Sequence, residues 1–329
     1  MGWIKKLGPG LLFAGAAIGV SHLVQSTRAG ADFGWGLLWA LFLANLFKYP
    51  FFEYGTRYEL ATGNNLLEGY AKLGKHYLWG YFLLNLATMF TIQTAVTIVT
   101  ASLASILFGE VLNLVLWSAL ITLACLLILW SGNYRFLDRI IKWIILILSL
   151  STIITVIIAG SNPVHPSSFT QIFPSRSALI FLAAFMGWMP APMDISIWQS
   201  IWSQEKSKTN TISVQEGLFD YKFGYMVTLI LGICFMGLGT FVLYGSGTTF
   251  SNSGSTFAKQ LIDLYTATLG KGVYPFIAIA AFTTMFSTTL TTLDASPRAM
   301  ENASKLLFPQ KEYLNFRFWI LLLAAGTVA

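Results

Sequence analysis

Two ionisable side chains stand inside apolar stretches of the sequence. His22 lies in GPGLLFAGAAIGVSHLVQSTRAG, and Asp194 lies in FLAAFMGWMPAPMDISIWQS. An ionisable group at the centre of a bilayer costs at least about 2.5 to 3.5 kcal/mol, so it normally faces the protein interior and has a partner. A neutral imidazole and a carboxylate that meet could bind a divalent cation, or they could simply pair with each other.

Both stretches contain residues that interrupt helices. The first carries Gly10, Gly15 and Gly19, and the second carries Pro190 and Pro192, each of which removes a backbone donor and clashes with the preceding turn. Interrupted helices at matching places in two halves of a chain indicate a substrate site in transporters with inverted repeats. The alternative is that the glycines allow close packing and the prolines make simple kinks.

The composition places these stretches in a membrane protein. Of 329 residues, 55% are hydrophobic and 10% are charged, and the mean hydropathy is +0.66. An ordinary soluble domain carries about 25% charged residues, so a soluble surface is excluded. The net charge of +6 does not indicate nucleic-acid binding, because the basic residues are scattered between apolar blocks. Cys125 and Cys234 lie in apolar stretches and are expected to be small buried side chains.

The apolar blocks have the length of membrane-spanning helices, about 20 residues at 1.5 Å per residue. In lipid each block must be a helix, because its backbone polar groups have to be satisfied within the segment. We predict an all-α polytopic membrane protein, not an enzyme, with nine hydrophobic segments at about 9–27, 35–56, 78–108, 112–131, 140–160, 177–203, 223–245, 272–297 and 318–329.

The distribution of Lys and Arg predicts the orientation. With the N-terminus inside, the cytoplasmic connections hold most of them, including Lys5, Lys6, Arg57, Lys72, Lys206, Lys305 and Arg317. The outer connections hold only Arg28, Arg176, Lys259 and Lys271. This bias predicts a cytoplasmic N-terminus in a plasma membrane, which we expect to be bacterial. The expected partners are the bilayer and a transported cation, with no nucleic acid and no obligate protein partner.

Hydroxyl and charged side chains mark a possible path through the eighth segment. Thr284, Ser287, Thr288 and Thr291 share one helix face, and Asp294 lies four residues before Arg298. They could line a permeation path that ends at an inner gate. Equally, the hydroxyls could bond back to carbonyls one turn earlier, and Asp294 and Arg298 could form an ordinary interfacial ion pair.

At this point the sequence resembles a known family, the natural-resistance-associated macrophage protein (NRAMP) family of divalent-metal transporters. The similarity is greatest from residue 8 to about 75, through GPGLLFAGAAIGVSHLVQSTRAGADFGWGLLWALFLANLFKY and YGTRYELATGNNLLEGY, and extends more weakly to Ala329. The resemblance implies a LeuT-like inverted repeat of five plus five helices. Residues 1–329 would form one transmembrane domain, with 1–160 as the first repeat and 161–329 as an incomplete second repeat, helices six to nine.

The hallmark residues of the family are replaced here. Its Asp-Pro-Gly-Asn motif falls on residues 19–22, Gly-Val-Ser-His, and its Met-Pro-His motif falls on residues 191–193, Ala-Pro-Met, followed by Asp194. The acidic pair that the family uses for proton movement falls on Gln93 and Val96, beside the neutral Thr94 and Thr97. Usual proton coupling is therefore not expected.

The residues leave the identity of the ion open. Loss of the methionine thioether favours a hard ion such as Mg²⁺, whereas His22 favours manganese, iron or zinc. We expect transport of a divalent metal by alternating access, with the metal as substrate and no cofactor; the alternative is an organic cation or amino acid.

The expected metal ligands are His22 and Asp194, and the expected substrate-binding residues are Gly19, Ser21, His22, Trp188, Ala191, Met193 and Asp194. The expected polar pathway is Gln93, Thr94, Thr97, Thr284, Ser287, Thr288 and Thr291, with Asp294 and Arg298 as a possible gate.

Overall fold

A computed structural model describes residues 8–328 except 110, 131–133, 162, 164, 165, 174, 209–212, 248, 249, 252, 253, 271 and 273. Within this part of the chain every regular element is a helix, as predicted. The elements are α1 (Pro9–Ala17), η1 (Val20–Ser26), α2 (Thr27–Phe33), η2 (Gly34–Leu37), α3 (Leu38–Thr62), α4 (Leu66–Leu73), α5 (Lys75–Phe108), α6 (Leu114–Trp130), α7 (Tyr134–Ser161), η3 (Arg176–Ala178), α8 (Leu179–Trp188), α9 (Ile195–Ser207), α10 (Val214–Val242), α11 (Gly254–Leu269), α12 (Tyr274–Leu307) and α13 (Phe316–Val328).

Each hydrophobic segment predicted from the sequence coincides with a helix or with consecutive helices. Two further helices, α4 and α11, were not predicted because neither is a long apolar block. The start of α4 follows from a capping box, in which the Asn65 side chain accepts from the N–H groups of Leu67 and Glu68. The Glu68 carboxylate in turn accepts from the Asn65 N–H at 2.7 Å.

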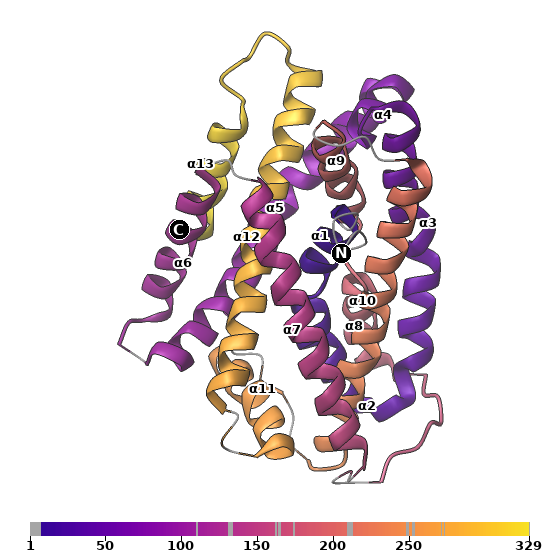
Figure 1. Ribbon diagram of the computed structural model, residues 1–329, viewed down its shortest axis with the longest axis vertical. Helices are drawn as coiled ribbons and strands as arrows, with labels where there is room; N and C mark the ends of the chain where they lie inside the picture. Colours follow the sequence, from indigo (N-terminus) through magenta and orange to yellow (C-terminus); the bar gives the residue numbers. More distant parts are fainter. Residues whose placement is uncertain are drawn as a thin grey trace.

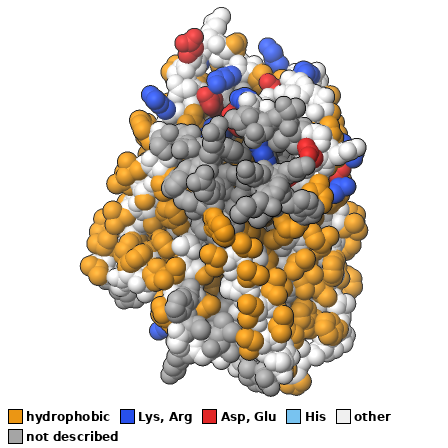
Figure 2. All heavy atoms as spheres, in the orientation of Figure 1, with side chains coloured by type: hydrophobic (Ala, Val, Ile, Leu, Met, Phe, Trp, Pro, Cys, Tyr) orange, Lys and Arg blue, Asp and Glu red, His pale blue; other side chains and the backbone are white. Residues whose placement is uncertain are grey.

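The surface has the distribution expected of a protein in a bilayer. In the part of the chain that the structure describes, three helical stretches are long and apolar enough to cross a membrane, namely Val20–Thr62, Lys75–Phe108 and Val214–Val242. In Figure 2, hydrophobic side chains cover the middle and lower parts of the visible face, and most Lys, Arg, Asp and Glu gather at the upper end. That end carries α4, α9 and the end of α12 (Figure 1). Lys5, Lys6 and Lys271 lie outside the described residues.

Helix α10 is the central packing element for the first span. It packs against α1, α2, α3 and α7, while α5 packs along α12. Glycines allow these close approaches: a Cβ on Gly224 of α10 would lie 2.0 Å from the Gly10 carbonyl oxygen, and one on Gly239 would lie 2.1 Å from the Thr27 oxygen. The Asp220 carboxylate of α10 caps α1, accepting from the N–H groups of Gly8 at 3.0 Å and Gly10 at 3.0 Å. The first span is therefore fixed to α10 at both ends.

Candidate functional site

The first span is interrupted where the glycines predict it. Helix α1 ends at Ala17, Ile18 has φ −81° and ψ 81°, and Gly19 has φ −146° and ψ −123°. The chain then continues as a single π-helical stretch, η1. A Cβ on Gly19 would lie 2.7 Å from side-chain atoms of Thr288, so α12 packs directly against the break.

The sixth predicted span is interrupted at its prolines. Helix α8 ends at Trp188, residues 189–194 are not helical, and α9 begins at Ile195. Lys48 of α3 stabilises this break, because its ammonium donates to the carbonyl oxygens of Gly187 at 2.6 Å and Ala191 at 3.1 Å. The Lys48 ammonium supplies hydrogen bonds to carbonyl oxygens that lack helical partners because of the break. Its positive charge also interacts favourably with the negative, C-terminal end of the α8 dipole.

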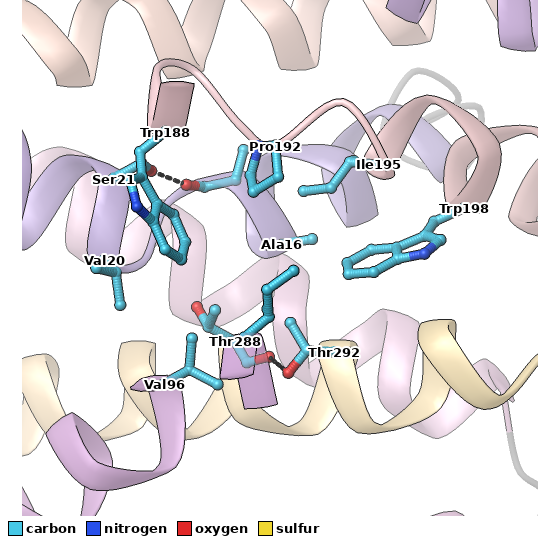
Figure 3. Close-up of a pocket in the computed structure, with 12 residues that line it drawn as sticks. Ala16, Val20, Ser21, Val96, Trp188, Pro192, Ile195, Trp198, Thr288 and Thr292 are labelled. Carbon is cyan, nitrogen blue, oxygen red and sulfur yellow. Dashed lines mark hydrogen bonds between the residues drawn. The ribbon is translucent and has the colours of Figure 1, made fainter. Parts of the chain in front are cut away.

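The two breaks flank one small cavity in the interior (Figure 3). Its volume is about 20 Å³, which is room for about one water molecule or a small ion. In Figure 3, Trp188 and Trp198 lie on opposite sides of it, and Thr288 and Thr292 reach it from α12. Its wall consists of Ala16, Ala17, Val20, Ser21, Ile92, Val96, Trp188, Pro192, Ile195, Trp198, Thr288 and Thr292.

The oxygen atoms in this wall are neutral and already engaged. Ser21 Oγ donates to the Ala17 carbonyl oxygen. Thr292 Oγ1 lies 2.6 Å from Gln93 Oε1, and Thr288 Oγ1 lies 3.3 Å from the carbonyl oxygen of Ile18. Among the described residues of the wall there is no carboxylate, imidazole or thiol. The cavity can therefore offer hydroxyl and carbonyl oxygens to a solute, but no charge.

His22 is completely buried and points away from this cavity. Its Nε2 atom lies 2.8 Å from the carbonyl oxygen of Thr228 on α10. Its Nδ1 atom lies 2.7 Å from Ser21 Oγ and 3.1 Å from the Ala17 oxygen. Because a carbonyl oxygen can only accept, Nε2 carries a proton in this arrangement. With the proton on Nε2, Nδ1 of the neutral ring can only accept, so its partner is the Ser21 hydroxyl, whose one proton lies between Nδ1 and the Ala17 oxygen. His22 thus joins η1 to α10.

Asp194 lies at the other break but faces a different hollow. A cavity of about 820 Å³ lies between α3, α4, α5 and the start of α9, and both Met193 and Asp194 line it. We call it the aromatic groove and define it by Phe51, Tyr54, Tyr70, Tyr77, Tyr81 and Asp194.

The structure thus brings the two breaks together, as predicted, but it does not place the His22 imidazole and the Asp194 carboxylate in the wall of one cavity. Consistently, the described residues contain no cluster of three His, Cys, Asp or Glu side chains suited to a metal.

The other residues predicted to bind substrate fall into two groups. Ser21 and Trp188 line the small cavity, and Gly19 packs against Thr288, which also lines it. Ala191 is buried and its carbonyl oxygen is taken by Lys48, while Met193 is 40% exposed and faces the aromatic groove. Among the residues that the structure describes, no thioether lines the small cavity.

The predicted polar pathway forms mainly a hydrogen-bond network between α5 and α12. Gln93 Nε2 donates to the Thr289 oxygen at 3.2 Å and approaches Thr97 Oγ1 at 3.4 Å, and Gln93 Oε1 accepts from Thr292. Thr94 is half-buried with no hydrogen bond recorded for its hydroxyl. The network is neutral, in the segment where the resemblance places proton-carrying acids.

The hydroxyls of α12 bond mostly to their own helix. Thr284 donates to the Ala280 oxygen at 2.8 Å, and Thr291 donates to the Ser287 oxygen at 3.0 Å. The Ser287 hydroxyl is buried without a partner among the described atoms. Of the four predicted residues only Thr288 lines the cavity. Local back-bonding therefore describes Thr284 and Thr291 better than a continuous polar wall does.

The Asp294–Arg298 pair forms as its spacing predicts. Arg298 Nε lies 2.8 Å from both carboxylate oxygens of Asp294, which is completely buried. The Trp202 indole of α9 also donates to Asp294, at 3.4 Å, and the Arg298 guanidinium lies 4.8 Å from the centre of the Phe316 ring. The pair therefore joins α9, α12 and α13 at the charged end of the molecule.

Three residues of this region were missed from the sequence. Lys48 lies inside an apolar predicted span, and a lysine at such a position indicates that hydrogen-bond acceptors lie near it in the protein interior. Trp198 and Thr292 line the cavity, but nothing in their spacing distinguishes them from ordinary core residues.

Comparison with known proteins places the whole chain in one group. The family model described as natural resistance-associated macrophage protein-like (Nramp) matches residues 10–329. An uncharacterized protein of Pasteurella multocida is 38% identical over 95% of this chain and 75% of its own length. A divalent metal cation transporter of Chromohalobacter salexigens is 25% identical over 80% of this chain and 61% of its own length.

Solved structures show the same fold. A manganese transporter of Eremococcus coleocola, in complex with an aromatic bis-isothiourea compound, has a TM-score of 0.68 at 16% identity, covering 98% of this chain and 68% of that one. A nucleobase-cation-symport-1 family transporter has a TM-score of 0.67 at 12% identity, covering 98% of this chain and 70% of that one. The fold is thus that of polytopic, all-α transporters.

Proposed function

This chain belongs to the natural resistance-associated macrophage protein-like (Nramp) family, a family of transporters and not of enzymes, and we propose that it moves a divalent metal cation across the membrane by alternating access. The observation that carries the proposal is the position of the two helix breaks, residues 18–19 and 189–194, on either side of one small cavity. Backbone N–H and C=O groups that lack helical hydrogen bonds are tolerated inside a membrane where they line such a cavity.

In this proposal the conformation described is close to an occluded state, because the cavity is small and most of its lining residues are buried. Pro192 and Ile195 line it, and Asp194 between them faces the aromatic groove. A rotation of the first turn of α9 would carry the carboxylate from the groove to the cavity. Asp194 then supplies the negative charge that a dication needs, and the hydroxyls of Ser21 and Thr288 supply neutral oxygens.

This set of donors favours a hard cation that keeps part of its water shell, such as Mg²⁺ or Mn²⁺. His22 holds the first break to α10 in the conformation described, and it could become a ligand only if its bond to Thr228 opened.

We also propose that residues 1–160 and 161–329 are repeats, because α1–η1 and α8–α9 are the interrupted helices of the two halves. In this proposal the charged end in Figure 2 is the cytoplasmic end, and the N-terminus is cytoplasmic, as the distribution of Lys and Arg in the sequence predicts.

Transport without proton coupling is part of the same proposal. Gln93 and its threonine partners Thr97 and Thr292 have no proton to release near neutral pH. A network of this kind can hold α5 against α12, but it cannot carry charge with the substrate.

A second candidate substrate is a small organic cation or an amino acid. Trp188 and Trp198 face the cavity, and its wall lacks a carboxylate among the described residues. Aromatic faces attract organic cations without any formal charge in the wall. Such a substrate is larger than the cavity described, which would have to widen to admit it.

Uptake by proteoliposomes distinguishes these substrates. We expect the reconstituted protein to take up Mn²⁺ or Mg²⁺, and Asp194→Asn to reduce the rate at least about tenfold, because a dication loses its only anionic ligand. The matched control is Asp263→Asn, a neutralised acid on the exposed face of α11. Uptake of an organic cation or amino acid without metal uptake would favour the second candidate, and metal uptake that is unchanged in Asp194→Asn would remove Asp194 from the site.

A further inference from the structure

The aromatic groove has the size and the lining of a ligand site. Its volume of about 820 Å³ is in the range of pockets for drug-sized molecules, and it lies outside the small cavity between the breaks. Phe51, Tyr54 and Tyr77 remain 59%, 58% and 55% exposed along it. Aromatic faces of this kind attract a cation that approaches within about 6 Å of the ring.

The charge in the groove wall is a carboxylate without a cationic partner. No Lys, Arg or His among the described residues forms an ion pair with Asp194. Asp194 occupies the N-cap position of α9, yet its side chain accepts no capping hydrogen bond. A carboxylate in apolar surroundings is costly unless a cation neutralises it. The Asp194 carboxylate is thus available to a ligand.

A second polar group lies beside it. The Tyr81 hydroxyl is buried, and the Trp198 indole of α9 lies within reach of it. Tyr81 and Asp194 both line the groove. Tyr81 thus links the groove wall to α9, and Asp194 supplies the negative charge in a wall that is mostly aromatic and aliphatic.

The chemistry of the groove selects one class of ligand. A tightly bound metal ion would need more ligands than one carboxylate, and the described residues offer no cluster of His, Cys, Asp or Glu there. An anion would be repelled by Asp194. His76 lines the groove as well, and its exposed ring lies against Tyr77, with 4.1 Å between ring centres and an angle of 41° between the ring planes. We propose that the aromatic groove binds a lipophilic organic monocation, with its charge on Asp194 and its apolar groups against the aromatic side chains.

Occupation of the groove has a consequence for α9. The residues at its start, Met193, Asp194 and Ser196, line the groove, whereas Ile195 and Trp198 line the small cavity. A bound cation holds Asp194 in the groove and so opposes the rotation by which α9 would present it to the cavity. The ligand would therefore inhibit metal transport; this consequence rests on the proposed function, whereas the binding itself does not.

Binding of radiolabelled tetraphenylphosphonium to the purified protein in lipid nanodiscs tests the site. We expect saturable binding that weakens at least about tenfold in Asp194→Asn, because the charge that holds the cation is gone. Tetraphenylborate, an anion of the same shape, should show no saturable binding. Asp263→Asn on α11 is the control for removal of an acid, and it should bind tetraphenylphosphonium as the wild type does.

A second pair of variants tests the place of binding. Gly80 lines the groove, and a Cβ there would have no atom within 4 Å, so the side chain of Gly80→Phe begins in open space and takes up volume in the groove. It should abolish binding, whereas Gly187→Phe, at an equally open position on α8, should not. Absence of saturable binding in the wild type, equal binding of tetraphenylborate, or unchanged binding in both Asp194→Asn and Gly80→Phe would overturn the proposal. Since binding is measured without transport, these results are independent of whether the protein moves a metal.

Discussion

The Nε2 atom of His22 lies 2.8 Å from the carbonyl oxygen of Thr228, and this bond joins the interrupted first span to the middle of α10. Together with the contacts of Gly10 and Gly30 with α10, it fixes both parts of the span to one helix. The first break is therefore held in place by its neighbour, and the proposed transport cycle needs the start of α9 to move relative to it.

Replacing His22 by Ala should destabilise the protein. The change leaves the buried Thr228 oxygen without its donor and opens a hole beside η1, which together should lower the free energy of unfolding by about 2 to 4 kcal/mol. Thermal unfolding followed by size-exclusion chromatography measures this loss. His76→Ala, at an exposed histidine on α5, is the control and should unfold as the wild type does. Equal stability of the two variants would mean that the His22 bond does not hold the span.

Replacing Lys48 by Met should destabilise the second break. The Gly187 and Ala191 oxygens lose a charged donor in apolar surroundings, for which we expect a cost of about 1 to 3 kcal/mol. The control is Lys305→Met, which removes an exposed lysine paired with Glu301 and should change stability by less than about 1 kcal/mol. Differential scanning fluorimetry in the same detergent compares the two, and a smaller loss for Lys48→Met than for Lys305→Met contradicts the assignment.

Replacing Gly224 by Ala should separate α1 from α10. The new methyl group would lie 2.0 Å from the Gly10 oxygen, a backbone atom that cannot rotate away, so the two helices have to move apart. We expect a loss of at least about 2 kcal/mol, as for other overpacked interfaces. Gly80→Ala adds the same methyl group to α5 where nothing lies within 4 Å. A midpoint of thermal unfolding that is the same for both variants would show that the contact is looser than described.

Metal uptake should proceed without proton entry. Gln93 stands among Thr97, Thr289 and Thr292, none of which changes its charge between pH 5 and 8. Proteoliposomes loaded with a pH-sensitive dye should therefore show metal uptake with no internal acidification. Acidification that rises in proportion to the metal taken up would mean that a group outside this network carries the proton.

Positions of the spans and their interruptions could be predicted from the sequence, whereas the direction of individual side chains could not. Runs of apolar residues determine where helices cross the bilayer, and Gly19 and Pro190 determine where two of them stop. The rotation of each segment about its axis depends on the packing of its neighbours. For that reason His22 and Asp194, both correctly placed at the breaks, were predicted to meet, although one bonds to α10 and the other faces the groove.

The location of a bound ion tests the central proposal most directly. Crystals of the protein grown with Mn²⁺ should show an anomalous-scattering peak between residues 18–21 of the first break and residues 189–194 of the second, with the Asp194 carboxylate among its ligands. A peak elsewhere in the membrane region, or none between the breaks at Mn²⁺ concentrations that saturate uptake, would contradict the assignment of this cavity as the transport site.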